Sequence, residues 1–214
     1  MAVPLVCLVR HGETEWSVSG QHTGTSDIPL TENGERVARL LEPVLAREKF
    51  ALVLTSPLLR ARRTCELAGL APDAVIDRDL IEWDYGDYEG LTPKQIHALS
   101  PRWMLFSDGC PGGESPEQVG TRVDRVISRV RDQGGHVALF AHGHIFRVFA
   151  ARWLGLPASA GSRFLLDTAT LSVLSYYRGV SALKRWNAPL SPESFQRSLR
   201  RHPSSAATEL EKVS

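Results

Sequence analysis

An imidazole beside a guanidinium follows the first apolar run of this chain, where Arg10-His11-Gly12 succeeds Val3–Val9. Short apolar runs bounded by a turn signal are typical of buried strands, and open α/β sheets bind their ligands beyond strand ends. An imidazole nitrogen is a nucleophile near neutral pH, and a guanidinium matches phosphate oxygens in bidentate fashion. Taken alone, the tripeptide is better explained as a strand end with incidental surface charge.

A second cation follows another predicted strand, Phe50–Thr55. Ser56-Pro57 is a typical helix start, so a helix is expected over Leu58–Leu70, with Arg60 in its first turn. A cation at this end opposes the helix dipole, which a bound phosphate would make tolerable. The neighbouring Arg62 and Arg63 are better explained as a solvated face.

A carboxyl group and a second imidazole complete the candidates. Glu82 stands among the acids and aromatics of residues 80–90, where a partly dry setting would suit a general acid. The acids Asp84 and Asp87 of the same segment are better explained as surface residues. The segment His142-Gly143-His144 follows the apolar run His136–Ala141, so it also lies at a predicted strand end.

The elements that must position these groups alternate between strand-like and helix-like patterns, which predicts an α/β domain. A helix is expected from Thr31 to about Arg47, with Val37, Leu40, Leu41, Val44 and Leu45 on its buried face. The other expected elements are helices over 116–133 and 145–154, a short extended segment over 74–76, and antiparallel strands over 171–177 and 182–186. One domain is predicted over residues 1–190, followed by a poorly ordered tail over 191–214.

The composition limits the partners that the protein can have. A net charge of +1 argues against a nucleic acid as the main partner. The three cysteines are scattered, with no metal-ligand spacing, which fits a reducing compartment better than a disulfide framework. No signal peptide and no run of membrane-spanning length is evident. These features predict a soluble, cytoplasmic protein without a membrane partner.

Four motifs occur in an order that resembles the histidine phosphatase superfamily over about residues 5–186. They are Arg10-His11-Gly12, Ser56-Pro57-Leu58-Leu59-Arg60-Ala61, Glu82 before Tyr85-Gly86-Asp87-Tyr88-Glu89-Gly90, and Ala141-His142-Gly143. The resemblance implies a phosphoglycerate-mutase-like three-layer sandwich, with a mostly parallel central sheet and helices on both faces. Within the superfamily, the loops look most like those of sedoheptulose-1,7-bisphosphatase-type sugar phosphatases.

The resemblance also implies roles for these residues. His11 would accept the phosphoryl group, Arg10, Arg60 and a protonated His142 would surround its oxygens, and Glu82 would act as general acid and then base. No cofactor and no metal is implied. Further substrate contacts are expected from Ser17, Gln21, Thr23, Gly24, Gly143, His144 and Arg147. A second phosphate could be bound by His144 and Arg147, although local packing of His144 and solvation of Arg147 explain them equally well.

The expected function is hydrolysis of a small phosphorylated metabolite, most simply a sugar phosphate or bisphosphate. One alternative is a cofactor-dependent phosphoglycerate mutase, and another is a non-catalytic phosphate-binding protein. Only sixty positions separate Glu82 from His142, whereas the mutases carry a longer insertion there that helps to close the site, so the short segment favours hydrolysis. Residues 93–113 are expected to shape a lid. The sequence leaves the oligomeric state open, a homodimer included.

Overall fold

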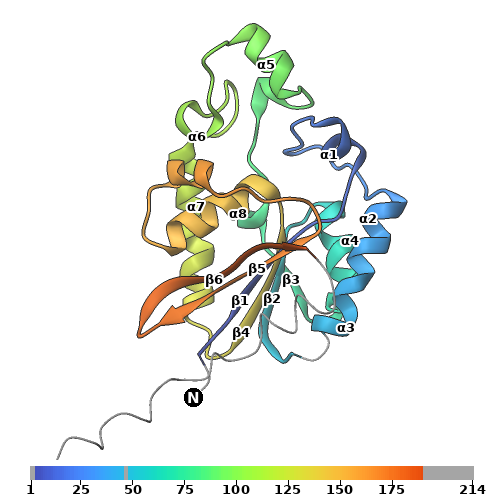
Figure 1. The fold of residues 1–214 in the computed structure, drawn as a ribbon, viewed down its shortest axis with the longest axis vertical. Coiled ribbons are helices and arrows are strands. Elements are labelled where there is room, and N and C mark those ends of the chain that lie inside the picture. The colour runs from blue at the N-terminus through green and yellow to red at the C-terminus, as the bar shows by residue number, and fades with distance from the viewer. Residues whose placement is uncertain (1–2, 46–47, 190–214) are drawn as a thin grey trace, which may run out of the picture.

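The computed structural model describes residues 3–45 and 48–189, which form a six-stranded sheet with helices on both faces (Figure 1). The strand order is β3-β2-β4-β1-β5-β6. The first four strands pair in parallel, whereas β5 pairs antiparallel with both of its neighbours, β1 and β6. The strands are β1 (Val6–Arg10), β2 (Phe50–Thr55), β3 (Ala74–Ile76), β4 (His136–Ala141), β5 (Thr170–Tyr177) and β6 (Val180–Pro189). The predicted α/β class with a mostly parallel sheet is confirmed, while the predicted tail over 191–214 lies outside the described residues.

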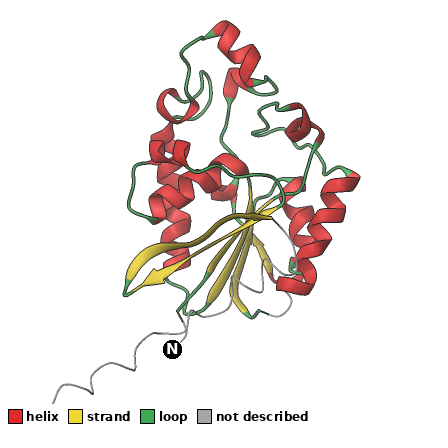
Figure 2. Cartoon of the chain, in the orientation of Figure 1, coloured by secondary structure: helices red, strands yellow, loops and turns green. Residues whose placement is uncertain are grey.

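The helices cover the two faces of the sheet in separate groups (Figure 2). The α-helices are α1 (Glu15–Ser19), α2 (Glu32–Ala38), α3 (Glu42–Leu45), α4 (Leu59–Leu67), α5 (Pro93–Leu99), α6 (Leu105–Asp108), α7 (Pro116–Arg131) and α8 (Gly143–Trp153). Short 3-10 turns are η1 (Arg39–Leu41), η2 (Ala71–Asp73), η3 (Arg78–Leu80), η4 (Gly86–Tyr88) and η5 (Ala158–Arg163).

The interiors of the central strands are apolar because both of their faces are buried. Along β1, Val6 and Leu8 belong to the core formed with α7 and α8. The alternate residues Cys7 and Val9 belong to the core formed with α3 and α4. Successive side chains of a strand point to opposite faces, so one short run supplies both layers of the sandwich.

The single helix predicted from Thr31 to Arg47 is wrong, because the chain forms α2, η1 and α3 in succession. Pro43 lies inside the predicted helix and has no N–H to donate to the carbonyl four residues earlier. The break also turns Leu40 outward, where 38% of it is exposed, although the helical pattern predicted it to be buried.

Three short helices that the sequence pattern did not predict, α1, α5 and α6, lie beyond the carboxyl ends of the parallel strands (Figure 1). A capping box begins each of the first two: Thr14 pairs with Ser17 in α1, and Thr92 with Gln95 in α5. Residues 93–113 thus lie on the side of the sheet where a lid was expected. Within 3–45 and 48–189, none of the helices has the length and apolar character needed to cross a bilayer.

Candidate active site

Parallel pairing of β1 with β4 brings the two predicted imidazoles together. The register sets Arg10 opposite Ala141, and the next N–H, that of His11, donates to the Ala141 carbonyl at 3.0 Å. The rings of His11 and His142 consequently lie with their centroids 5.2 Å apart. Ser56 follows β2, and its N–H donates to the Phe140 carbonyl at 2.9 Å, so three strand ends meet at one edge of the sheet.

His11 is a buried, neutral imidazole with a defined tautomer. Its pKa is held well below the ordinary 6.5, first by burial and then by the charges of Arg60 and Arg10. Its Nδ1 lies 2.7 Å from the Gly12 carbonyl oxygen, which can only accept, so Nδ1 carries the proton. The other nitrogen, Nε2, therefore has a free lone pair, as a nucleophile requires.

Arg10 reaches from the end of β1 across the start of α8. One Nη1–H donates to the Leu166 carbonyl, whereas Nε is buried and has no partner among the described residues. A Cβ added at Gly143 would lie 3.1 Å from the Arg10 Cζ atom, so glycine there leaves room for the guanidinium. An unpaired buried donor costs about 1–3 kcal/mol, which a bound acceptor would offset.

Arg60 is completely buried. Its Nη1 donates to the Ser26 carbonyl at 2.8 Å, and its Nη2 to the carbonyls of Thr23 and Gly24, both at 3.0 Å. Across the described part of the chain, neither Arg60 nor Arg10 forms an ion pair. Burial lowers the pKa of both guanidinium groups. A completely buried Arg60 beside a half-buried Arg10, neither paired with a carboxylate among the described residues, is costly unless an anion binds between them.

His142 is neutral in this structure, whereas its predicted role suits the protonated form that a bound phosphate dianion would favour. Arg60 Nε–H donates to His142 Nδ1 at 3.1 Å, so Nδ1 is unprotonated, and His142 Nε2 lies 2.8 Å from Ser56 Oγ. Its pKa is held well below 6.5 by burial, then by Arg60, His11 and Arg10. His142 is therefore neutral, because the positive charges expected to act with it also repel its proton.

Glu82 is held against the first turn of α8. Its Oε2 accepts the His144 N–H at 2.9 Å, and its Oε1 accepts the N–H groups of Ile145 at 2.8 Å and Trp83 at 2.9 Å. The carboxylate satisfies two helix donors that have no partner within the helix. This contact explains why α8 begins at Gly143, two residues before the predicted start.

Four of the predicted substrate contacts lie in residues 17–24, the segment that follows the nucleophile in the sequence. Ser17 Oγ is engaged with Thr14 in the capping box of α1, and Gln21 Nε2 donates to the Gly90 carbonyl at 2.8 Å. The Thr23 and Gly24 carbonyls accept from Arg60. This segment thus supports Arg60 through its backbone, a contribution that residue types alone did not indicate.

His144 and Arg147 lie on α8 beside an aromatic cluster. Tyr85, whose pKa burial holds well above 10, forms a hydrogen bond between its hydroxyl group and His144 Nδ1. Burial also holds the pKa of His144 well below 6.5, so its imidazole is neutral. Its ring stacks on that of His22, with centroids 6.0 Å apart. Arg147 donates to the Gly161 carbonyl at 3.1 Å and lies over the Phe106 ring.

Gly12 lies against α2. A Cβ at this position would lie 2.6 Å from the Gly34 carbonyl oxygen. Glycine is therefore required for the loop after β1 to pack against α2, whatever the loop binds. No group of three or more His, Cys, Asp or Glu side chains within the described ranges is arranged to hold a metal ion.

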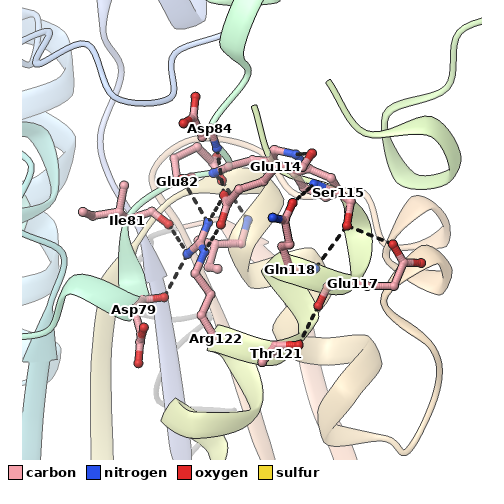
Figure 3. Close-up of polar contacts among 12 residues, drawn as sticks. Asp79, Ile81, Glu82, Asp84, Glu114, Ser115, Glu117, Gln118, Thr121 and Arg122 are labelled. Atoms are coloured by element: carbon pink, nitrogen blue, oxygen red, sulfur yellow. Dashed lines mark hydrogen bonds and ion pairs between the residues drawn. The ribbon is translucent and has the colours of Figure 1, made fainter. Parts of the chain in front are cut away.

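The sequence analysis missed Arg122 and Glu114, which support the Glu82 segment (Figure 3). Arg122 Nη2 donates to the Glu82 carbonyl at 3.0 Å, and Arg122 Nε donates to Glu114 Oε1 at 2.7 Å. The helical pattern predicted α7, but Arg122 was not distinguished from the other polar residues on it. Its position three residues after the buried Val119, at the edge of the apolar stripe, is the signal that could have drawn attention to it.

Comparison with known proteins yields matches over nearly the whole described chain. The model of the histidine phosphatase superfamily (branch 1) matches residues 6–189. An acid phosphatase from Mycobacterium tuberculosis is 39% identical over 180 residues, covering 82% of this chain and 88% of the relative. Sedoheptulose 1,7-bisphosphatase from Saccharomyces cerevisiae is 39% identical over 186 residues, covering 72% of this chain and 68% of the relative. The solved structure of an open reading frame product from M. tuberculosis, 36% identical, superposes with a TM-score of 0.83 over 88% of this chain and 99% of that one.

Proposed function

Since this chain belongs to the histidine phosphatase superfamily and is an enzyme that hydrolyses phosphate esters, we propose that its substrate is a small phosphorylated metabolite, a sugar phosphate or bisphosphate. We further propose that hydrolysis proceeds through a phosphohistidine. The observation that carries this proposal is the placement of two guanidinium groups, the half-buried Arg10 and the completely buried Arg60, beside a neutral imidazole, with no carboxylate paired to either among the described residues. A phosphate dianion is the ligand that would neutralise both charges.

In the first step, His11 Nε2 attacks phosphorus and forms an N–P bond while the ester P–O bond breaks. The Gly12 carbonyl keeps the proton on Nδ1, so the lone pair of Nε2 is free to attack phosphorus. Arg10 and Arg60 stabilise the charge on the phosphoryl oxygens, which is the main requirement of phosphoryl transfer. Beside a dianionic phosphate, the neutral His142 would gain a proton more readily.

Glu82 supplies the proton that the departing alkoxide needs. In the second step, its carboxylate takes a proton from the water that attacks the phosphohistidine. The N–P bond then breaks, its electron pair returns to Nε2, and inorganic phosphate leaves. The three backbone donors around Glu82 hold the carboxyl in one place for both steps.

The sugar moiety is proposed to lie beside the reacting groups. Ser17, Gln21, Thr23, Gly24 and Gly143 are proposed as further substrate contacts beside the phosphoryl site. Two relatives are named acid phosphatase and sedoheptulose 1,7-bisphosphatase, which favours a small ester over a macromolecule. For a bisphosphate, Arg147 is the proposed contact of the second phosphate, since His144 beside it is neutral. A screen of phosphate release over sugar phosphates, bisphosphates, phosphoglycerates and nucleotides, ranked by kcat/KM, tests this assignment.

Substitution of Glu82 tests the acid role. Glu82→Gln is expected to lower kcat/KM for a sugar phosphate by about 10²- to 10⁴-fold, because an alkoxide leaves poorly without a proton. For p-nitrophenyl phosphate the loss should stay below about tenfold, since this leaving group needs little protonation. Both rates are measured by initial-rate phosphate release.

Glu35→Gln is the matched control, because Glu35 pairs with Arg63 and Arg39 on the surface of α2. It should leave both rates unchanged. An equal loss on both substrates in Glu82→Gln would remove Glu82 from the acid role. Transfer of the phosphoryl group to a second metabolite in place of water would favour a mutase instead.

A further inference from the structure

The segment that carries Glu82 has no regular secondary structure of its own. It runs between η3, which ends at Leu80, and η4, which begins at Gly86. Yet its Glu82 side chain is only 5% exposed and meets three backbone donors. A general acid misplaced by about 1 Å can lose a hundredfold in rate, so something outside the segment must hold its backbone.

Arg122 contacts this segment from α7. Its Nη1 donates to the carbonyls of Asp79 at 2.9 Å and Ile81 at 2.6 Å, and its Nη2 donates to that of Glu82 at 3.0 Å (Figure 3). The side chain is nearly buried. Three carbonyls within residues 79–82 therefore bind one guanidinium, whose planar shape sets their relative positions.

Glu114 completes the arrangement on the other side of Arg122. Its carboxylate accepts from Arg122 Nε at 2.7 Å and from Nη2 at 2.8 Å. The same carboxylate accepts the Asp84 N–H at 2.9 Å, and the Glu114 carbonyl accepts the indole N–H of Trp83 at 2.9 Å. The pair thus holds the chain on both sides of Glu82.

Arg122 and Arg10 use their N–H donors differently. All five N–H groups of Arg122 donate to protein acceptors. Arg10, by contrast, keeps a buried Nε without a partner among the described residues. Arg122 therefore has no donor left for a substrate, and its contribution to the reaction must pass through the residues that it holds.

We propose that Arg122 and Glu114 are positioning residues for Glu82, setting where its carboxyl meets the leaving group. Arg122 holds the Glu82 backbone from α7, while the first turn of α8 holds the carboxylate. The inference rests on the proposed function, in which Glu82 protonates the leaving group. It predicts that substitution of Arg122 or Glu114, like substitution of Glu82, lowers kcat/KM by a factor that depends on the leaving group.

Two conservative variants test this inference. Arg122→Lys keeps the charge but removes the planar fork, and Glu114→Gln keeps an acceptor for Asp84 but removes the charge. For each we expect kcat/KM on a sugar phosphate to fall about 10- to 100-fold, with less than about a threefold change on p-nitrophenyl phosphate. The double variant Glu82→Gln/Arg122→Lys should be no slower than Glu82→Gln alone, since residues that act as a unit are not additive.

Arg125→Lys is the matched control, since Arg125 lies on the same helix and pairs with the Asp79 carboxylate instead of the Glu82 backbone. It should leave both rates unchanged. If Glu82→Gln is selective for the poor leaving group but both pair variants slow the two substrates equally, the pair is merely structural and the inference is wrong. If Glu82→Gln itself shows no selectivity, the acid role fails and the inference fails with it. Should Arg122→Lys not fold, Glu114→Gln alone decides between these outcomes.

Discussion

Replacement of His11 with asparagine is expected to lower kcat by about 10⁴-fold or more, the scale of losing a catalytic nucleophile. The asparagine amide can still donate to the Gly12 carbonyl, as His11 Nδ1 does at 2.7 Å. What it lacks is the lone pair of Nε2. The positions of Arg10 and Arg60 do not depend on the His11 ring, since Leu166 and residues 23–26 hold them, so phosphate should still bind.

The phosphohistidine intermediate is measured directly by mixing the enzyme with ³²P-labelled substrate and quenching the reaction rapidly without acid. The wild-type protein should retain an acid-labile label, and His11→Asn should retain none. His136→Asn is the matched control, because His136 lies at the opposite end of β4 and accepts the Leu5 N–H at 3.0 Å. It should keep both the label and the rate. Turnover in His11→Asn near that of the wild type would exclude a covalent path through this residue.

The sequence predicted the two imidazoles because each follows an apolar run, and such a pattern is local. His11 and His142 both come directly after buried strands, and parallel pairing of β1 with β4 places such ends side by side. The break at Pro43 also has a local cause, because the missing N–H of proline outweighs the apolar spacing around it. The capping box of Thr92 with Gln95 is a comparable local signal for α5.

Other features could not be predicted, because they depend on contacts between distant parts of the chain. Arg122 meets carbonyls about forty residues earlier in the sequence, and no helical pattern identifies its partners. The neutral state of His142 arises from burial next to Arg60 and Arg10, which the motif alone does not reveal. The reason for Gly12 likewise lies in α2, which packs against it.

The fold should lose stability steeply in mild acid, for the same reason that its nucleophile is neutral. The imidazoles of His11, His142 and His144 have pKa values held well below the ordinary 6.5, with burial the first cause in each case. Once unfolded, these imidazoles titrate near 6.5. Between the two values the unfolded chain binds more protons than the folded one, so the free energy of unfolding falls as the pH falls below 6.5.

Each such imidazole contributes at most about 1.4 kcal/mol per pH unit, so the three together contribute at most about 4 kcal/mol per unit below pH 6. Urea unfolding at pH 7.5, 6.5 and 5.5 measures this slope, which is shallow above pH 6.5 because the imidazoles are then neutral in both states. His144→Asn should reduce the slope by at most about 1.4 kcal/mol per pH unit. A free energy of unfolding that stays constant from pH 6.5 to 5.5 would mean that these imidazoles take up protons in the folded protein, and a neutral His11 would no longer explain the nucleophile.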